Sequence, residues 1–193
     1  MRRSLAVLFA VLLALTPCDG QDRPSVLVVY YSMTGHTRTM AEAVAEGARS
    51  VEGVTVVLRS VDQATIDDVL AADALIIGSP VHNANVVPEI QAFMNQWPFE
   101  NAPLAGKIGA AFVTGGGISA GEELVQLNIL HSMLIFGMIV VGGPEWTQPF
   151  GASAVTYEHP FATSDSTHIG PAFRQKGFAL GRRVAELTKD LHH

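Results

Sequence analysis

The sequence predicts an α/β fold in which a parallel β-sheet is covered by helices on both faces. The first observation is that five short, continuously apolar runs follow one another along the chain, and each is typical of a strand buried on both faces. The second is that segments with apolar residues at helical spacing separate these runs. Ligands of such sheets bind beyond the carboxyl ends of the strands.

Each element can be placed along the chain. The expected strands are residues 26–31, 54–58, 74–78, 108–113 and 138–141. The expected helices are residues 37–49, a short helix around 66–70, then 87–96, 122–135 and 171–191. Pro98 forbids continuation of the third helix. A long polar stretch, residues 142–170, separates the last strand from the last helix.

Length and composition indicate one folded domain. The chain has 193 residues, of which 48% are hydrophobic and 16% charged, so it can bury a sizeable core. The net charge is −6, and Lys and Arg do not cluster beyond the first residues. We therefore expect no nucleic-acid partner.

The first 20 residues have the pattern of a bacterial secretory signal, which leaves residues 21–193 as the domain. Arg2 and Arg3 precede an uninterrupted apolar run of eleven residues, 5–15, and small and polar residues follow. The run is shorter than the roughly 20 apolar residues that span a bilayer. The alternative is a buried hydrophobic helix. We expect export to the periplasm or lipid anchoring to a bacterial membrane.

Two routes of processing stay open. Cys18 lies in a segment that resembles a lipoprotein cleavage box, although Pro17 is a poor residue before the cut. Cleavage after Gly20 is the alternative, and only the first leaves a lipid anchor. The paired arginines also allow twin-arginine export. Cys18 is the only cysteine, so the folded domain has no disulfide.

The loop after the first strand carries the clearest chemical signal. It combines hydroxyl groups, a glycine and the start of a helix, a combination that forms an anion site from free N–H groups. The loop residues are Ser32, Met33, Thr34, Gly35, His36 and Thr37. The loop has neither the lysine of a nucleotide triphosphate loop nor a GxGxxG pattern, so a terminal monophosphate fits best. The alternative is a Ser/Thr-rich turn that caps a helix.

Residues 30–48 resemble the FMN phosphate loop of the flavodoxin-like family, and most closely that of the WrbA-type NAD(P)H:quinone oxidoreductases, which share the Ser-Met-x-Gly-His core. The similarity continues at residues 78–94 and 104–117, and more weakly at 136–142. It implies a flavodoxin-like three-layer sandwich with a five-stranded parallel sheet of order 2-1-3-4-5 and helices on both faces. It also implies FMN as cofactor, NAD(P)H as electron donor, a quinone-like acceptor, and a homodimer or homotetramer as an alternative to a monomer.

Two further loops match family segments that contact the flavin ring. The loop after the third strand contributes Pro80, Val81, His82, Asn83 and Asn85. The loop after the fourth strand contributes Thr114, Gly115, Gly116 and Gly117. Glycines let the backbone approach a flat ring and offer amides to it, and such amides stabilise a reduced, anionic flavin. The alternatives are an exposed polar turn and a flexible surface loop.

The sequence departs from the family pattern at several positions. His82 and Asn83 stand where WrbA-type proteins usually carry an arginine and an aromatic residue, and Phe136 stands where they carry a histidine that faces the flavin. His131 lies inside a helix and is interpreted as packing. The remaining aromatic candidates are Trp146 and Tyr157, which either cover the flavin or pack, and Trp97 and Phe99, which lie where the family draws an aromatic from a neighbouring subunit.

Three functions remain open from the sequence. The first is an FMN-dependent oxidoreductase that passes two electrons from NAD(P)H to a quinone or a similar acceptor. The second is a flavodoxin-like electron carrier, and the third is a flavin-free binding module. The ring-side loops lack aromatic residues apart from His82, which leaves a ring face open and favours the enzyme. No side chain is assigned as a catalytic acid or base, and no metal site is expected.

Overall fold

The computed structural model describes residues 23–165 and 167–192. The predicted secretory signal and its cleavage sites lie outside the described residues. Five parallel strand positions form one sheet in the order β2-β1-β3-β4-β5, which confirms the predicted fold class and strand order. The strands are β1 (Ser25–Tyr30), β2 (Thr55–Ser60), β3 (Ala74–Pro80), β4 (Ile108–Gly115), β5 (Ile139–Val140) and β6 (Ala152–Val155).

The fifth position of the sheet is divided between two segments. β5 pairs only with Ile108 and Gly109 at the start of β4, whereas β6 pairs in parallel with residues 112–115 at its end. The sequence predicts one strand at residues 138–141 and leaves the polar stretch after it without a strand. The second half of this position therefore comes from that stretch, and β6 ends at the same edge as the candidate loops.

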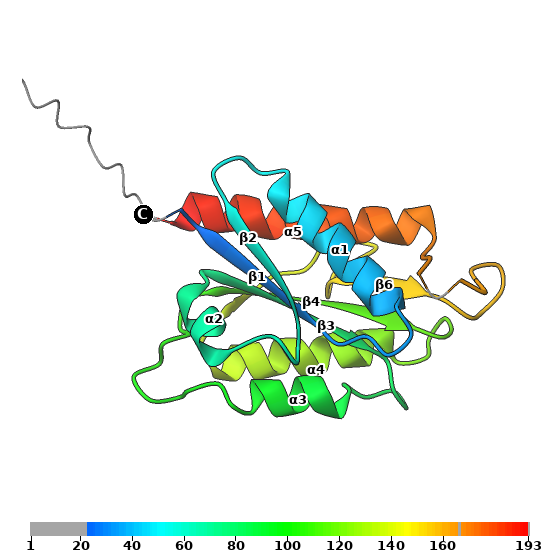
Figure 1. Ribbon diagram of the computed structural model, residues 1–193, viewed down its shortest axis with the longest axis horizontal. Coiled ribbons are helices and arrows are strands. Elements are labelled where there is room, and N and C mark those ends of the chain that lie inside the picture. Colours follow the sequence, from blue (N-terminus) through cyan, green and yellow to red (C-terminus); the bar gives the residue numbers. More distant parts are fainter. Residues whose placement is uncertain (1–22, 166, 193) are drawn as a thin grey trace, which may run out of the picture.

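Helices cover both faces of the sheet, so the molecule has three layers (Figure 1). The helices are α1 (His36–Arg49), α2 (Ile66–Ala71), α3 (Pro88–Met94), α4 (Glu122–Ile135) and α5 (Pro171–Leu191). Alternate residues of each strand point to opposite faces. In β1, Leu27 and Val29 join the core beneath α2, α3 and α4, whereas Val26 and Val28 join the core beneath α1 and α5.

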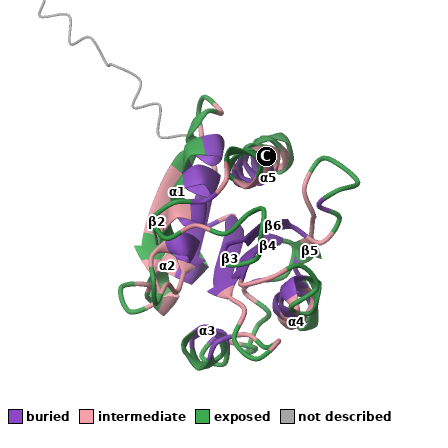
Figure 2. Ribbon diagram, turned by 90° about the vertical axis from the view of Figure 1, so that its right-hand side faces the viewer, coloured by how far each residue is buried: buried purple, intermediate pink, exposed green. Residues whose placement is uncertain are grey.

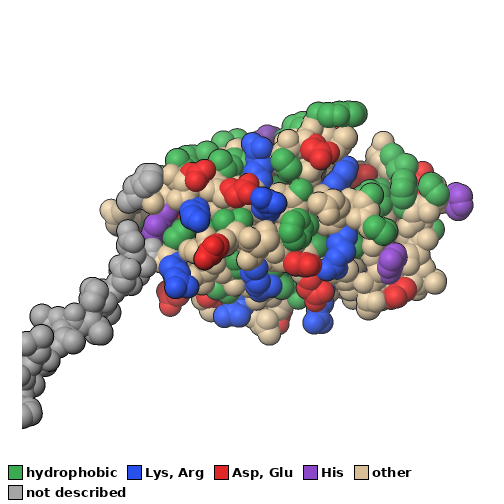
Figure 3. Space-filling view, turned by 90° about the horizontal axis from the view of Figure 1, so that it is seen from above, with side chains coloured by type: hydrophobic (Ala, Val, Ile, Leu, Met, Phe, Trp, Pro, Cys, Tyr) green, Lys and Arg blue, Asp and Glu red, His purple; other side chains and the backbone are tan. Residues whose placement is uncertain are grey.

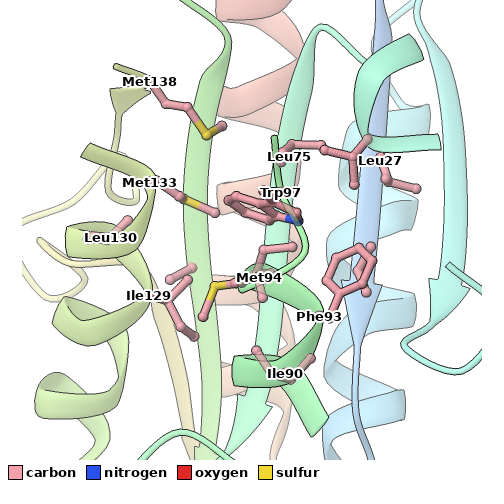
Figure 4. Close-up of a cluster of buried hydrophobic side chains, with 14 of the residues drawn as sticks. Leu27, Leu75, Ile90, Phe93, Met94, Trp97, Ile129, Leu130, Met133 and Met138 are labelled. Atoms are coloured by element: carbon pink, nitrogen blue, oxygen red, sulfur yellow. The ribbon is translucent and has the colours of Figure 1, made fainter. Parts of the chain in front are cut away.

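Apolar burial explains this layering. Figure 2 shows the central strands buried and the outer faces of the helices exposed. Figure 4 shows the core on the α3 and α4 side, where Trp97 and Met94 lie among side chains of α4 and the sheet. On the other face, Gly47 and Gly181 allow α1 and α5 to touch through their backbones, since a Cβ on either would lie 1.9 Å from a carbonyl oxygen of the other helix.

The outer face of α1 and α5 carries charges of both signs. Figure 3 shows Lys and Arg side chains interspersed with Asp and Glu over this face. Arg174 of α5 and Glu46 of α1 form an exposed ion pair at 2.7 Å. Among the described residues, no helix is long and apolar enough to cross a membrane, and no group of three or more His, Cys, Asp or Glu side chains is placed to hold a metal ion.

The two ends of the described chain meet at the amino edge of the sheet. The Asp73 carboxylate accepts hydrogen bonds from the backbone N–H of Ser25 at 2.8 Å and from its hydroxyl at 2.9 Å. The ring of His192, just beyond α5, lies 3.7 Å from the same carboxylate. Nearby, Lys107 donates to the carbonyl oxygen of Leu70 at 2.7 Å, and burial lowers the pKa of its ammonium group.

Candidate functional site

The loops after β1, β3 and β4 meet at the carboxyl edge of the sheet, as the parallel topology requires. The hydroxyl of Thr37, at the start of α1, lies 2.7 Å from the hydroxyl of Thr114 in β4, and both side chains are buried. The N–H of Val81, after β3, donates to the Thr114 carbonyl at 2.8 Å. Thr114 therefore links all three candidate loops through hydrogen bonds.

The loop after β1 presents a row of backbone N–H groups without partners. Gly35, at a φ of 110°, turns the chain into α1, and its N–H donates to the Ser32 hydroxyl at 3.1 Å. Within residues 23–165 and 167–192, no hydrogen bond is made by the N–H groups of Ser32, Met33, Thr34, His36, Thr37 and Arg38. Unpaired N–H groups at the N-terminus of a 14-residue helix form an anion site, so these residues fit a phosphate group.

His36 begins α1 inside this site. Its side chain is buried, and its Nδ1 lies 3.1 Å from the Thr34 hydroxyl. Its ring meets the Tyr157 ring edge-on, with the two centroids 5.4 Å apart. Burial lowers the pKa of the His36 imidazole, and His168 adds to this effect, whereas the carbonyl and carboxylate of Asp165 oppose it. Burial therefore favours a neutral His36 ring.

The loop after β3 is a tight, exposed turn. Pro80 ends β3, and His82 and Asn85 exchange backbone hydrogen bonds of 3.1 and 2.9 Å around Asn83 and Ala84, which both have positive φ. The Asn85 side chain donates to the Asn83 carbonyl at 2.8 Å. The side chains of His82, Asn83 and Asn85 are exposed, and the His82 imidazole is the only aromatic ring among these three.

The glycine-rich loop after β4 is held by a segment that the sequence interpretation missed. The Gly115 carbonyl accepts hydrogen bonds from the N–H and hydroxyl of Thr156 at 3.0 and 3.1 Å, and the Gly116 carbonyl accepts one from the N–H of Tyr157 at 2.9 Å. In the described part of the chain, the N–H groups of Gly116 and Gly117 have no partner. Backbone donors are thus available at this loop.

Tyr157 is brought to the site, whereas the other aromatic candidates are not. Its ring contacts the His36 ring, and a Cβ on Gly116 would lie 3.4 Å from Cδ2 of the Tyr157 ring. Trp146 is 89% exposed in the connection between β5 and β6 and makes no ring contact within the described chain. The only hint of this role in the sequence is that Tyr157 follows shortly after a short apolar segment, residues 152–155.

Phe136 lies at the opposite edge of the sheet. It follows α4 and precedes β5, which places it where strands begin, and its ring stacks on Phe99 at a centroid distance of 4.2 Å. Trp97 also contacts this ring but is only 3% exposed, so it cannot extend toward a neighbouring chain, whereas Phe99 is 62% exposed. Phe136 therefore cannot face a flavin in its own chain. His131 is exposed on α4 and does not pack in the core, which corrects that interpretation.

Comparison with known proteins agrees with this geometry. The family model described as NADPH-dependent FMN reductase matches residues 59–153. A flavodoxin of Aquifex aeolicus is 41% identical over 83% of this chain and 85% of the relative, and a Syntrophobacter fumaroxidans NAD(P)H dehydrogenase (quinone) is 31% identical over 86% and 98%. The chain belongs to the WrbA-type flavodoxin-like family.

Solved structures show the same fold for this flavodoxin-like chain. A WrbA-like flavodoxin from Agrobacterium tumefaciens matches 86% of this chain and 98% of its own, with a TM-score of 0.71 and 22% identity. A flavodoxin from the domain Archaea matches 86% and 99%, with a TM-score of 0.67 and 27% identity. The sequence relatives thus confirm the recognition of the family, and the solved structures confirm the fold.

Proposed function

We propose that the protein is an FMN-dependent oxidoreductase that takes electrons from NAD(P)H and passes them to a quinone or a similar acceptor. One observation carries the proposal. Among the described residues, the N–H groups at the start of α1 and the amides of Gly116 and Gly117 have no hydrogen-bond partner, and the hydrogen bond between Thr37 and Thr114 joins the two loops. The first group suits a terminal phosphate and the second a flat ring with carbonyl oxygens.

Each loop has a distinct role in this proposal. The phosphate lies on Ser32, Met33, Thr34, Gly35, His36 and Thr37. The ring edge lies against Pro80, Val81, His82, Asn83 and Asn85 on one side and Thr114, Gly115, Gly116 and Gly117 on the other. FMN supplies the redox chemistry when bound, and these residues bind and orient it. No side chain of the site is assigned as a catalytic acid or base.

The exposed turn after β3 favours an enzyme over an electron carrier. Hydride transfer needs the donor ring stacked at about 3–3.5 Å, which requires an open flavin face. The exposed His82, Asn83 and Asn85 and the glycines after β4 are small or polar, so these two loops do not cover that face, and the Tyr157 ring that the fold brings to the site is itself 59% exposed. The relatives support both functions, because one is named a flavodoxin and others NAD(P)H dehydrogenase (quinone). The electron carrier is therefore the second candidate.

Cofactor identity is the first test. Residues 21–193 are purified, the absorbance spectrum is recorded, and the cofactor is released by heat and identified by chromatography. We expect FMN, since the loop is sized for a terminal phosphate. Recovery of FAD, or no flavin binding on addition of FMN, would contradict the proposal.

Turnover separates the two candidate functions. Stopped-flow mixing of the FMN-loaded protein with NADH or NADPH is expected to reduce the flavin, and a soluble quinone is expected to reoxidise it in a two-electron step. Light scattering on the same sample measures whether the protein is a monomer, a dimer or a tetramer. If neither nucleotide reduces the flavin while a one-electron donor does so in single-electron steps, the protein is a carrier.

We also propose that the protein is exported. The basic start, the apolar run and Cys18 support this proposal. Fractionation of cells that express the full chain should find a protein shortened by about 20 residues in the periplasm or on a membrane. Cys18→Ala should release a lipoprotein from the membrane and leave a soluble periplasmic protein unchanged. A full-length protein in the cytoplasm would refute export.

A further inference from the structure

Residues 156–158, directly after β6, form hydrogen bonds with successive residues of the glycine-rich loop. Thr156 and Tyr157 donate their backbone N–H groups to the carbonyl oxygens of Gly115 and Gly116. Glu158 completes the series in the other direction, because its Oε2 accepts the N–H of Ile118 at 2.6 Å. Figure 1 shows β6 ending at the edge where α1 begins, which agrees with the contact between His36 and Tyr157.

These hydrogen bonds determine which N–H groups of the loop stay available for a ligand. The carbonyl groups of Gly115 and Gly116 point toward the 156–158 segment, and the N–H of Ile118 donates to Glu158. The N–H groups of Gly116 and Gly117 are left without partners within the described chain. The Glu158 carboxylate is the one charged acceptor among these contacts in the described chain, and a charge-assisted hydrogen bond is roughly twice as strong as a neutral one in the same setting.

The carboxylate also places a negative charge directly beside the loop. A Cβ on Gly117 would lie 2.7 Å from Glu158 Oε2, so only glycine leaves room for the carboxylate at this position. Among the described residues, no Lys, Arg or His forms an ion pair with Glu158. Its carboxylate accepts the backbone N–H of Ile118, and because Glu158 is exposed, water and salt reduce the effect of its charge to what remains at contact distance.

We propose that Glu158 is a positioning residue with an electrostatic effect: it holds the glycine-rich loop in its binding shape, and it lowers the reduction potential of the bound flavin. The inference rests on the proposed function, since it requires FMN at this loop. Reduction adds negative charge to the flavin, and a carboxylate beside the amides that face the ring opposes that charge. Glu158 lies in the stretch 142–170, for which the sequence predicts neither a helix nor a strand.

Two substitutions at this residue separate shape from charge. Glu158→Gln keeps an oxygen that accepts the Ile118 N–H but removes the charge. It should bind FMN within about threefold of the wild type, while the ratio of reduced to oxidised flavin at a fixed electrode potential rises about tenfold, or about 30 mV for a two-electron couple. Glu158→Ala removes both and should weaken FMN binding about tenfold, as measured by fluorescence titration.

The matched control is Glu123→Gln, which removes an exposed carboxylate from the first turn of α4 that makes no hydrogen bond with the loop in the described chain. It should change neither the affinity nor the potential. Gly117→Ala offers an independent route, because the added Cβ displaces the Glu158 carboxylate, and it should reproduce the weaker binding of Glu158→Ala. Circular dichroism and a thermal melt check that each variant folds. If Glu158→Ala does not fold, Glu158→Gln, which is closest in shape to the wild type, still tests the inference.

The outcomes distinguish this inference from the proposed function. If the wild-type domain binds no FMN, the proposed function fails, and this inference fails with it. If the wild type binds FMN but Glu158→Gln shows an unchanged potential, or a folded Glu158→Ala binds FMN as tightly as the wild type, the inference alone is overturned. A potential that shifts equally in Glu123→Gln would also overturn it, because the effect would then come from net charge and not from the loop.

Discussion

The loop after β1 and the glycine-rich loop after β4 lie side by side, yet they are shaped by different means. The first is built locally, since Gly35 turns the chain, Ser32 accepts the Gly35 N–H and α1 follows at once. The second takes its shape from residues 156–158, about forty positions later in the sequence. The shape of a loop of the first kind can be predicted from a short stretch of sequence. The shape of a loop of the second kind can be explained only once the fold places the distant segment beside it.

The largest expected effect comes from breaking the locally built loop. Gly35→Val places a β-branched residue at a φ of 110° and should abolish FMN binding, with a loss of at least about 100-fold, or about 2.7 kcal/mol. Thr34→Glu, which sets a negative charge beside the phosphate, should act in the same direction. Equilibrium titration with FMN measures both.

The control for this substitution is Gly106→Val at the opposite edge of the sheet. Gly106 also has a positive φ, of 81°, and a Cβ there meets nothing within 4 Å. The two valine variants should lose similar stability, of about 1–3 kcal/mol from backbone strain, but only Gly35→Val should lose FMN. Affinity within about threefold of the wild type in Gly35→Val would refute the phosphate site.

A second substitution breaks the contact between the turn after β3 and the loop after β4. A Cβ on Gly121 would lie 2.8 Å from the Ala84 Cα, and the residue has a φ of 109°. Gly121→Ala should destabilise the protein by about 3 kcal/mol and weaken FMN binding about tenfold, because the turn is pushed away from the glycine-rich loop. Urea unfolding and FMN titration test this, and a change below about 1 kcal/mol in stability would contradict it.

A third experiment measures the link between the two compared loops. Thr37→Val leaves the buried Thr114 hydroxyl without its 2.7 Å partner and should cost about 1–2 kcal/mol in the free energy of unfolding of the cofactor-free protein. Thr114→Val should cost a similar amount. The double variant should cost less than the sum, since no hydroxyl is then left unpaired. Strict additivity would show that the two hydroxyl groups do not stabilise each other.

The smallest expected effect is a pH dependence at His36. Burial lowers its pKa from the ordinary value of 6.5, so the unfolded chain binds more protons at this residue than the folded protein. Its effect on stability is absent well above pH 6.5 and becomes unfavourable as the pH falls below about 6.5, so the Tm should fall slightly on acidification. The groups that face it are Tyr157, Asp165 and His168.

His36→Gln should flatten this part of the pH profile of the thermal midpoint. His168→Gln is the useful comparison, because it removes a neighbouring titratable group and leaves the buried ring in place. An identical slope between pH 5 and pH 7 in the wild type and in His36→Gln would show that the buried imidazole does not contribute.

Much of the fold could be predicted because the signals are local. β1, β3 and β4 are buried on both faces, so each is an apolar run without alternation. The site residues after these strands followed from topology, which brings the carboxyl ends of parallel strands to one edge. The roles of the individual residues toward FMN stay predictions.

The parts that were not predicted depend on distant contacts. β6 has only four residues within a stretch rich in Gly, Pro and Ser, and its pairing with the end of β4 decides its conformation. The 156–158 segment reaches the site for the same reason. Phe136 was compared with a flavin-facing histidine, yet α4 carries the chain back to the amino edge before this residue, so one chain cannot bring it to its own loops.

The meeting of both chain ends at Asp73 has a practical consequence. Ser25 and His192 both approach this carboxylate, at the edge opposite the loops. A short linker could therefore join the two ends of the domain, and new termini could be opened in the exposed connection between β5 and β6, which gives a circular permutant. For the same reason, a tether near Ser25 or His192 would hold the domain on an electrode with its loops facing the solution.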